Sequence, residues 1–260
     1  MLNMQLAGYF KRHPYRTIAF LAIAASFLSY WAMGPGKLEF VELSSPKGFR
    51  ALVLDGGSSR FDPVLGSLQG AATPGTAVDT TYNVEKICKA LWRDEQAPTA
   101  GNLDTAINVV EFFDYRCPYC KTLTKILAGL RADGRIRVIY KEWPILGESS
   151  RLAARAALAA ARQGGYVAFH EKLMQSGFIP TIGYIEDLSS RLVINHPRLL
   201  KDMSLDEISA VLRRNHDLAS KLGLVGTPAL VVGRTIVEGA ITQEQLERLI
   251  AQEMSSPPVC

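Results

Sequence analysis

The stretch VVEFFDYRCPYCK, residues 109–121, decides the fold of this 260-residue chain. An apolar run ends at Phe113, and Cys117 and Cys120 follow shortly after it with Pro118 and Tyr119 between them. Proline is favoured at the first position of a helix, because its missing N–H has no partner to lose there. A strand ending at Cys117 and a helix starting at Pro118 would therefore place the Cys117 sulfur at a helix N-terminus.

Two cysteines in this arrangement suit reversible disulfide chemistry. The free backbone N–H groups and the dipole of a helix N-terminus favour a thiolate. Cys117 is therefore predicted to be the attacking thiol, and Cys120, one turn into the helix, the resolving thiol. A purely structural disulfide across two residues would constrain the unfolded chain little, so the pattern favours a redox role.

The same spacing also occurs in zinc sites, which need two further cysteine or histidine ligands close together. The four histidines are isolated along the sequence: His13, His170, His196 and His216. The pattern therefore predicts no metal site, and nothing in it calls for a cofactor.

The segments around the cysteines predict a β-α-β unit. Residues 107–113 form an almost continuous apolar run, which is typical of a central strand covered on both faces. A helix is predicted to end near Gly134, and a second strand lies within 135–146 and stops at Pro144. Strand, helix and strand in this order require a parallel pair, so the fold class is α/β.

Helices dominate the sequence on the far side of this unit. An alanine-rich segment and several amphipathic segments predict a helical insertion at about 148–221. Ser204 and Glu207 have the spacing of a capping box at the start of its last helix. One more amphipathic helix precedes the unit, within residues 83–94.

The C-terminal part predicts a hairpin and a closing helix. Residues 227–240 contain two short strands joined at Gly233 and Arg234, and Thr242 with Gln245 opens the helix at capping-box spacing. One domain is therefore expected over 82–254, followed by a short tail over 255–260.

The N-terminus indicates export. No residue from Thr17 to Gly36 is charged, whereas Lys11, Arg12 and Arg16 precede this segment. An apolar segment of about 20 residues can cross a bilayer, and basic flanking residues stay in the cytoplasm. Residues 1–36 are therefore predicted to be a single N-terminal transmembrane helix or a signal sequence, with the remaining chain exported.

Two alternatives remain open for this region. A cleaved signal peptide has the same charged start, but Trp31 and Met33 stand where a cleavage site needs small residues, which favours an uncleaved anchor. Residues 37–81 are predicted to be a linker or an N-terminal arm, with a short strand in KGFRALVLDGG (47–57). The net charge of +4 is spread along the chain and predicts no nucleic-acid partner.

Three motifs carry a resemblance to a known family. VVEFFDYRCPYCK, KEWPILGESS (141–150) and GLVGTPALVVGRTIVEGA (223–240) together resemble the DsbA-like thiol:disulfide oxidoreductases, exported bacterial members of the thioredoxin superfamily. The resemblance covers roughly 88–252 and implies a thioredoxin-like fold with an inserted helical domain. It further implies an enzyme of the bacterial periplasm that exchanges disulfides with thiol-containing exported proteins.

A role for Glu111 comes from the same resemblance. Glu111 lies six residues before Cys117, where the family has a buried acid that accepts the proton of the second cysteine, here Cys120. Burial would raise the pKa of such an acid into the range useful for proton transfer. The residues alone would also fit an acid at a strand edge that faces solvent.

The resemblance also implies a substrate-binding surface. Pro228 falls on the family's cis-proline opposite the disulfide, and Thr227 would pair through its backbone with an extended substrate chain. Pro118 and Tyr119 would meet the same substrate. Without the resemblance, Thr227-Pro228 would be read simply as the start of a strand.

Tyr119 leaves the direction of the reaction open. The strongest oxidants of the family have histidine at this position, and a tyrosine cannot become cationic, so a less oxidising couple is expected. An oxidase is favoured, reoxidised by a membrane partner of DsbB type. An isomerase or reductase would instead need a reducing membrane partner, and a non-catalytic chaperone or assembly factor is the alternative of another class.

Cys88 and Cys260 complete an even number of cysteines, which in an exported protein favours pairing. A disulfide between them would tie together the two ends of the domain. Alternatively, Cys88 is a small buried side chain and Cys260 a free thiol or a link to another molecule.

Overall fold

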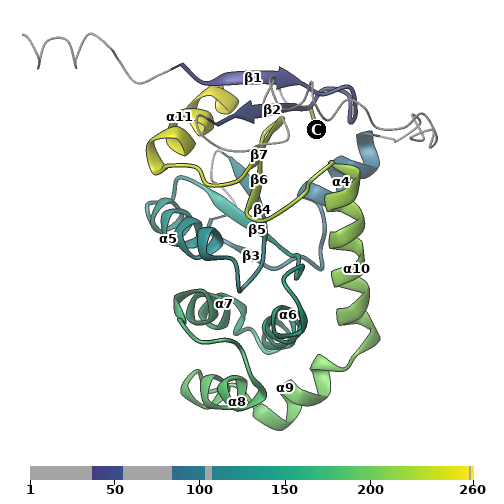
Figure 1. Cartoon of the computed structure of the whole chain (residues 1–260), viewed down its shortest axis with the longest axis vertical. Coiled ribbons are helices and arrows are strands. Elements are labelled where there is room, and N and C mark those ends of the chain that lie inside the picture. Colours follow the sequence, from purple (N-terminus) through teal and green to yellow (C-terminus); the bar gives the residue numbers. More distant parts are fainter. Residues whose placement is uncertain (1–36, 55–83, 103–106, 258) are drawn as a thin grey trace, which may run out of the picture. The chain divides into compact units, whose positions relative to one another are not determined.

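The computed structural model describes residues 37–54, 84–102, 107–257 and 259–260. Within them, a mixed sheet of seven strands carries helices on both faces, and a further group of helices lies beyond one end of the sheet (Figure 1). The strands, in sheet order, are β1 (Glu39–Glu42), β2 (Arg50–Val53), β7 (Thr235–Glu238), β6 (Ala229–Val232), β4 (Asn108–Phe113), β5 (Arg137–Glu142) and β3 (Thr99–Ala100). The helices are α4 (Val84–Trp92), α5 (Pro118–Ala132), α6 (Glu148–Ala161), α7 (Tyr166–Gln175), α8 (Ile182–Arg191), α9 (His196–Met203), α10 (Asp206–Lys221) and α11 (Gln243–Met254).

The predicted β-α-β unit forms the centre of the sheet. β4 pairs in parallel with β5 through the crossover helix α5, and on its other side it pairs antiparallel with β6. β6 and β7 form the predicted hairpin with Gly233 and Arg234 at its turn. β3 was not predicted, because a strand of two residues has no recognisable period.

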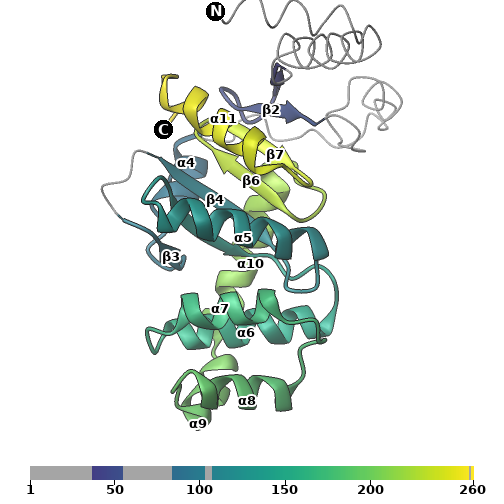
Figure 2. The same ribbon diagram turned by 90° about the vertical axis from the view of Figure 1, so that its left-hand side faces the viewer.

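Helices cover the sheet as two layers. α5 and α11 lie on one face, and α4 and α10 lie on the other (Figure 2). Because side chains alternate along a strand, Val110 and Phe112 of β4 point into the core that α4 and α10 cover. Glu111 and Phe113 point to the opposite face, which α5 covers. All of β4 except its first residue is buried, as its continuous apolar pattern predicts.

The helices α6 to α10 lie between β5 and β6 in the sequence. α6 is rich in buried alanine, and it packs closely against both α7 and α9. Small side chains allow this close approach because they leave little bulk between the helix backbones. The lower end of α10 belongs to this group, and its upper end reaches back to the sheet (Figure 1).

One of the two predicted capping boxes is wrong. α10 begins at Asp206, and its N-cap, Leu205, makes no side-chain capping bond. Ser204 instead ends α9, and its hydroxyl donates to the carbonyl of Lys201. Only two residues separate α9 from α10, and Ser204 is the C-cap residue of α9 and not the N-cap residue of α10. The box at Thr242 and Gln245 is present in full.

The described part of the predicted linker or N-terminal arm, 37–54, contains the short strand that the sequence predicts within 47–57, and this strand is β2. Residues of this part form β1 and β2, and β2 extends the sheet by pairing in parallel with β7. Arg50 anchors the hairpin: its guanidinium donates to Glu253 at 2.6 Å and to Thr235 at 2.8 Å. These partners lie about two hundred residues away in sequence, so no local pattern could reveal them.

Two further predictions concern residues outside the described ranges. The transmembrane helix or signal sequence over 1–36 lies there, as do residues 55–81 of the predicted linker or arm. Among the residues that the structure describes, no helix has the length and apolar character needed to span a bilayer.

A disulfide joins Cys88 of α4 to Cys260 at the end of the tail. Cys88 is buried, and Val259 packs against the same core cluster as α4. The tail is therefore fixed to the domain at its end.

Candidate functional site: the Cys117–Cys120 pair

The local sequence places Cys117 where the motif predicts it. Cys117 is the N-cap residue of α5, with extended backbone angles, and Pro118 occupies the first helical position. The Cys117 sulfur accepts a hydrogen bond from the backbone N–H of Cys120 at 3.3 Å. One of the free amides of the helix start therefore points at the sulfur.

These contacts stabilise the thiolate of Cys117. Its pKa falls to about 6, chiefly because the Cys120 thiol donates to it, with help from backbone N–H groups; partial burial acts in the opposite direction. At neutral pH most of Cys117 is therefore in the nucleophilic form.

Cys120 has the opposite character. Its side chain is wholly buried, and burial together with the neighbouring Cys117 raises its pKa far above the ordinary value. A protonated, shielded Cys120 beside an ionised Cys117 gives the two sulfurs distinct chemical behaviour.

Arg116 and Lys121, the basic residues that flank the motif, bind elsewhere. The Arg116 guanidinium donates to the carbonyl of Leu146 at 2.7 Å, and the Lys121 ammonium donates to the carbonyl of Ser176. Neither contributes to the lowered pKa of Cys117. They hold neighbouring loops near the start of α5.

Thr227 and Pro228 lie opposite the cysteines. The peptide bond between them is cis, and the Cys117 thiol lies 3.3 Å from the carbonyl oxygen of Thr227. β6 begins at the next residue, Ala229. The carboxyl end of β4 and the start of β6 therefore bring two sequence motifs, more than a hundred residues apart, to one site.

Asp114 is a site residue that the sequence reasoning missed. It is buried, and its carboxylate accepts from the backbone N–H of Arg116 at 2.7 Å, the hydroxyl of Ser150 at 2.7 Å and the backbone N–H of Leu146 at 2.8 Å. An aspartate directly after a strand commonly caps the following turn, which was the available signal. Asp114 thus fixes the loop after β5 against the turn that carries Cys117.

Glu111 is fully buried on the α5 face of β4, which excludes a position at a solvent-facing edge. No residue in the described part of the chain hydrogen-bonds to either of its carboxyl oxygens. Burial, and next the nearby charge of Cys117, raise its pKa to about 8. An unpaired acid of this kind is protonated at neutral pH and can give or take a proton near the cysteines.

Exposed apolar side chains lie on the segments that adjoin the pair. Tyr119 is 61% exposed, and Val225, two residues before Thr227, is 63% exposed. Leu146, beside Arg116, is 41% exposed, and Phe178, two residues after the Ser176 that Lys121 binds, is 76% exposed. Apolar groups exposed together in this way are typical of a surface that contacts another protein.

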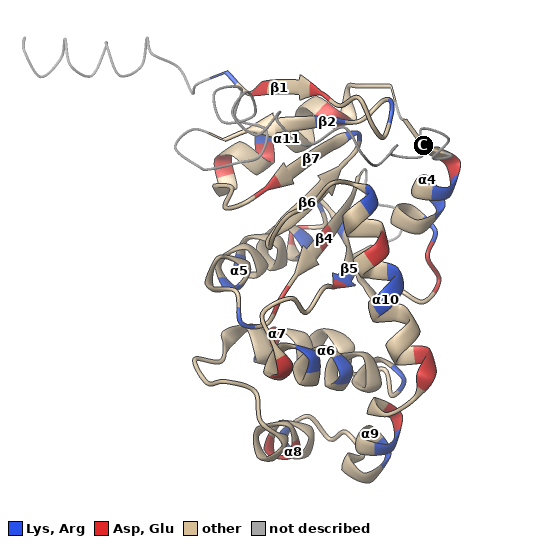
Figure 3. Ribbon diagram, turned by 45° about the vertical axis from the view of Figure 1, so that its right-hand side comes forward, with Lys and Arg blue, Asp and Glu red and all other residues tan. Residues whose placement is uncertain are grey.

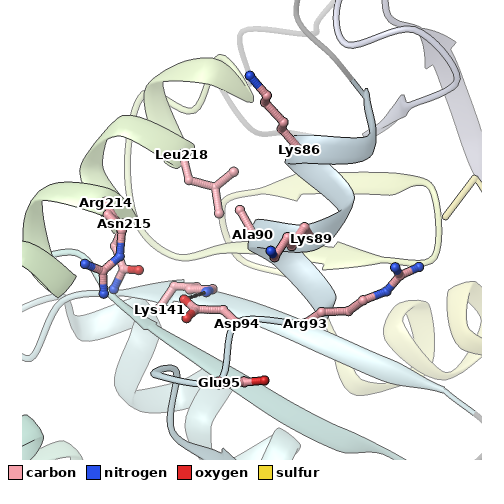
Figure 4. Close-up of a pocket in the computed structure, with 10 residues that line it drawn as sticks. All are labelled: Lys86, Lys89, Ala90, Arg93, Asp94, Glu95, Lys141, Arg214, Asn215 and Leu218. Atoms are coloured by element: carbon pink, nitrogen blue, oxygen red, sulfur yellow. Dashed lines mark hydrogen bonds and ion pairs between the residues drawn. The ribbon is translucent and has the colours of Figure 1, made fainter.

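A separate cavity of about 380 Å³ lies between α4 and α10. Both helices carry basic and acidic residues (Figure 3). Lys141 contributes to the lining from β5, but it is already paired with Asp94 at 2.6 Å, while Lys86 points away from both (Figure 4).

Among the residues that the structure describes, no cluster of His, Cys, Asp or Glu could hold a metal ion.

Comparisons with known proteins agree with this geometry. Residues 93–252 match the family model described as Thioredoxin. A thioredoxin-like oxidoreductase from Silicibacter pomeroyi is 39% identical, over 65% of this chain and 98% of its own, with a TM-score of 0.63. A periplasmic thioredoxin-like protein from Salmonella enterica serovar Typhimurium is 32% identical, over 66% of this chain and 97% of its own, with a TM-score of 0.60. Disulfide bond formation protein D of Bacillus subtilis is 25% identical over 170 residues, which are 60% of this chain and 77% of that protein.

Proposed function

Since this chain belongs to the thioredoxin family and is a DsbA-like thiol:disulfide oxidoreductase, we propose that it forms disulfides in exported proteins through Cys117 and Cys120. The observation that carries this proposal is the contrast between the two sulfurs. Cys117 is a stabilised thiolate at a helix N-terminus, and Cys120 is a buried thiol with a raised pKa.

The reaction starts from the disulfide form of the pair. A substrate thiolate attacks the Cys117 sulfur and breaks its bond to Cys120, which leaves as a thiolate and takes a proton from the Glu111 carboxyl group. A second substrate thiolate then attacks the substrate sulfur of the mixed disulfide and releases Cys117 as a thiolate. Two electrons pass from the substrate to the pair, and the substrate gains a disulfide.

The low pKa of Cys117 favours the oxidase direction. Stabilising the thiolate stabilises the reduced form of the pair, and the disulfide form is then the stronger oxidant. The name of the Bacillus subtilis relative, Disulfide bond formation protein D, points the same way. An isomerase or reductase is the second candidate, because Tyr119 adds no positive charge beside the thiolate.

Reduced, extended polypeptides fit the surroundings of the pair. The Thr227 backbone beside Cys117 can pair with a substrate strand, with Pro118, Tyr119 and Pro228 framing the contact. The exposed apolar side chains around the pair suit a substrate that has not yet buried its own core.

The place of action that we propose is the bacterial periplasm. The relative from Salmonella enterica is described as periplasmic, and the sequence of residues 1–36 has the pattern of an inner-membrane anchor with a cytoplasmic N-terminus. Each turnover leaves the pair reduced, so a membrane partner of DsbB type must remove two electrons from it.

Replacing Cys120 by alanine provides the test of this function. In Cys120→Ala the Cys117 thiolate can still attack a disulfide of a substrate protein, but there is no Cys120 thiol to displace that protein again, so this variant is expected to accumulate covalent mixed disulfides with many periplasmic proteins. The complexes are separated by gel electrophoresis with and without a reductant.

The Cys117→Ala, Cys120→Ala double variant is the control for this test. It keeps the fold and the apolar surface but has no reactive sulfur at the site. Complexes that persist unchanged in the double variant would contradict catalysis and favour a chaperone or assembly factor.

A further inference from the structure

A chain of buried hydrogen bonds lies beside the redox pair, between the sheet and α7. The carboxyl oxygen Oε1 of Glu142, at the end of β5, accepts from the hydroxyls of Tyr115 and Tyr166, each at 2.8 Å. The Tyr115 hydroxyl also lies 3.1 Å from Nδ1 of His170, whose side chain is wholly buried. Glu142, Tyr115 and His170 are therefore linked in series.

The far end of this chain lies near Glu111. In the parallel pairing of β4 with β5, Glu111 stands beside Tyr140, and Phe113 stands beside Glu142. Glu111 and Glu142 therefore lie on the same sheet face as diagonal neighbours, with about 7–8 Å between their Cα atoms. The His170 ring packs on both intervening residues, with centroids 4.8 Å from Phe113 and 4.7 Å from Tyr140. His170 consequently sits between the two acids.

Several polar atoms at this place have no protein partner among the described residues. They are both carboxyl oxygens of Glu111, Oε2 of Glu142 and Nε2 of His170. Buried polar atoms rarely stay unpaired, and ordered water commonly supplies the missing bond. The position of His170 suggests such a water between its Nε2 atom and Glu111.

The two acids differ in how well they tolerate a negative charge. Burial raises the pKa of both, so both hold a proton while the pair is oxidised. After losing its proton, Glu142 keeps two tyrosine donors, whereas no described residue donates to Glu111. The two tyrosine donors therefore offset part of the cost that burial imposes on a negative charge at Glu142, and no described residue does so at Glu111.

The other charged groups around this chain are few. Asp114 and Glu111 disfavour a charge on Glu142, and Arg131 of α5 disfavours a charge on His170. Burial also lowers the pKa of His170 to about 3, so its ring stays neutral and can relay a proton without holding one.

We propose that Glu142 is a proton store for Glu111, connected to it through Tyr115 and His170. This inference rests on the redox function proposed above. While the pair is oxidised, protonated Glu142 donates from Oε1 to the Tyr115 oxygen, and the Tyr115 hydroxyl donates to Nδ1 of His170. When Glu111 protonates Cys120, the Glu142 proton moves to the Tyr115 oxygen and the Tyr115 proton moves to Nδ1 of His170, which leaves Tyr115 donating to the Glu142 carboxylate as in the structure with free cysteines. The proton on Nε2 of His170 then passes through water to Glu111. Glu142 ends as a carboxylate, and the other members end neutral.

Infrared difference spectra between the oxidised and reduced protein test this directly. In the wild-type protein, reduction is expected to remove the carbonyl band of protonated Glu142 and to leave that of Glu111. Glutamine keeps the acceptor for both tyrosines but has no proton to give, so in Glu142→Gln the Glu111 carboxyl group should stay ionised and the lost band should move to its different frequency. A lost band at the same frequency in the wild type and in Glu142→Gln would overturn the proposal.

Two tyrosine variants provide a matched comparison. Tyr115→Phe and Tyr166→Phe each remove one hydroxyl bonded to Glu142 at the same distance, but only Tyr115 continues to His170. Reduction of the disulfide by dithiothreitol, measured against pH, should slow about tenfold in Tyr115→Phe and stay within about twofold in Tyr166→Phe. Equal rates in the two variants would contradict the proton relay and would show that these hydrogen bonds have a structural role only.

The two proposals fail in different ways. If the Cys117–Cys120 pair of the wild-type protein cannot be reduced and reoxidised at all, the redox function is wrong. If the pair cycles normally and neither the spectra nor the rates depend on Glu142, only the proton store is wrong.

Discussion

Replacing Cys117 by serine is expected to slow disulfide exchange with a reduced peptide by at least about a thousandfold, because the sulfur that the substrate thiolate attacks is lost. Serine is similar in size and can still accept the backbone hydrogen bond at the start of α5, so the fold should be retained. The rate is followed as the oxidation of a two-cysteine peptide, with circular dichroism as the check on folding.

The pH dependence identifies the reacting group. In the reduced wild-type protein, alkylation should speed up as the pH rises through about 6 and then level off, since the thiolate fraction of Cys117 grows in this range. An ordinary thiol would react appreciably only above about pH 8. Cys117→Ser should lack the rise in alkylation rate near pH 6. If this rise remains in the variant, it belongs to a group other than Cys117.

Replacing Cys260 by serine should lower the free energy of unfolding by about 2–5 kcal/mol. The disulfide with Cys88 spans 172 residues of sequence, and closing so long a loop restricts the unfolded chain strongly. Cys260 is the better position to change, because Cys88 is a buried residue of α4 and its packing then stays intact. Urea unfolding of the oxidised proteins measures the difference.

The matched control is the wild-type protein studied with this disulfide reduced. With the Cys117–Cys120 pair reduced in both proteins as well, Cys260→Ser and the wild type should unfold at similar urea concentrations, whereas the oxidised wild type should unfold at a higher concentration than oxidised Cys260→Ser. Equal stability of Cys260→Ser and oxidised wild type would show that the disulfide does not stabilise the domain. Exchange by Cys117 should be nearly unaffected in the variant.

The sequence predicted the parts of the fold that depend on local patterns. The buried strand over β4, the helix start at Pro118 and the hairpin turn at Gly233 all follow from residue type and period, and the structure confirms them. The thioredoxin-like fold itself rested on resemblance and is confirmed by the comparisons.

The parts that were missed depend on contacts across the chain. β2 was predicted as a short strand, but its pairing with β7 was not, because its stabilising partner, the Glu253 carboxylate, comes from α11 near the other end of the sequence. Ser204 matched the capping pattern for the start of α10, but it is the C-cap residue of α9. Local patterns cannot rank such competing contacts.

The candidate site likewise has residues that the sequence motifs predict and residues that only tertiary contacts reveal. The positions of Cys117 and Cys120 on α5 were readable from the motif, and the cis bond before Pro228 came from the resemblance. His170 looked isolated, because its neighbours Tyr115 and Glu142 become partners only when α7 packs on the sheet. Buried polar networks of this kind need the tertiary structure to be seen.

The reduction potential of the Cys117–Cys120 couple, measured by equilibration with glutathione, tests the oxidase proposal most directly. The stabilised Cys117 thiolate, without a cation at Tyr119, predicts a value between about −120 and −200 mV, on the oxidising side of the glutathione pool. A value near about −270 mV, that of a cytosolic reductant, would contradict the proposal.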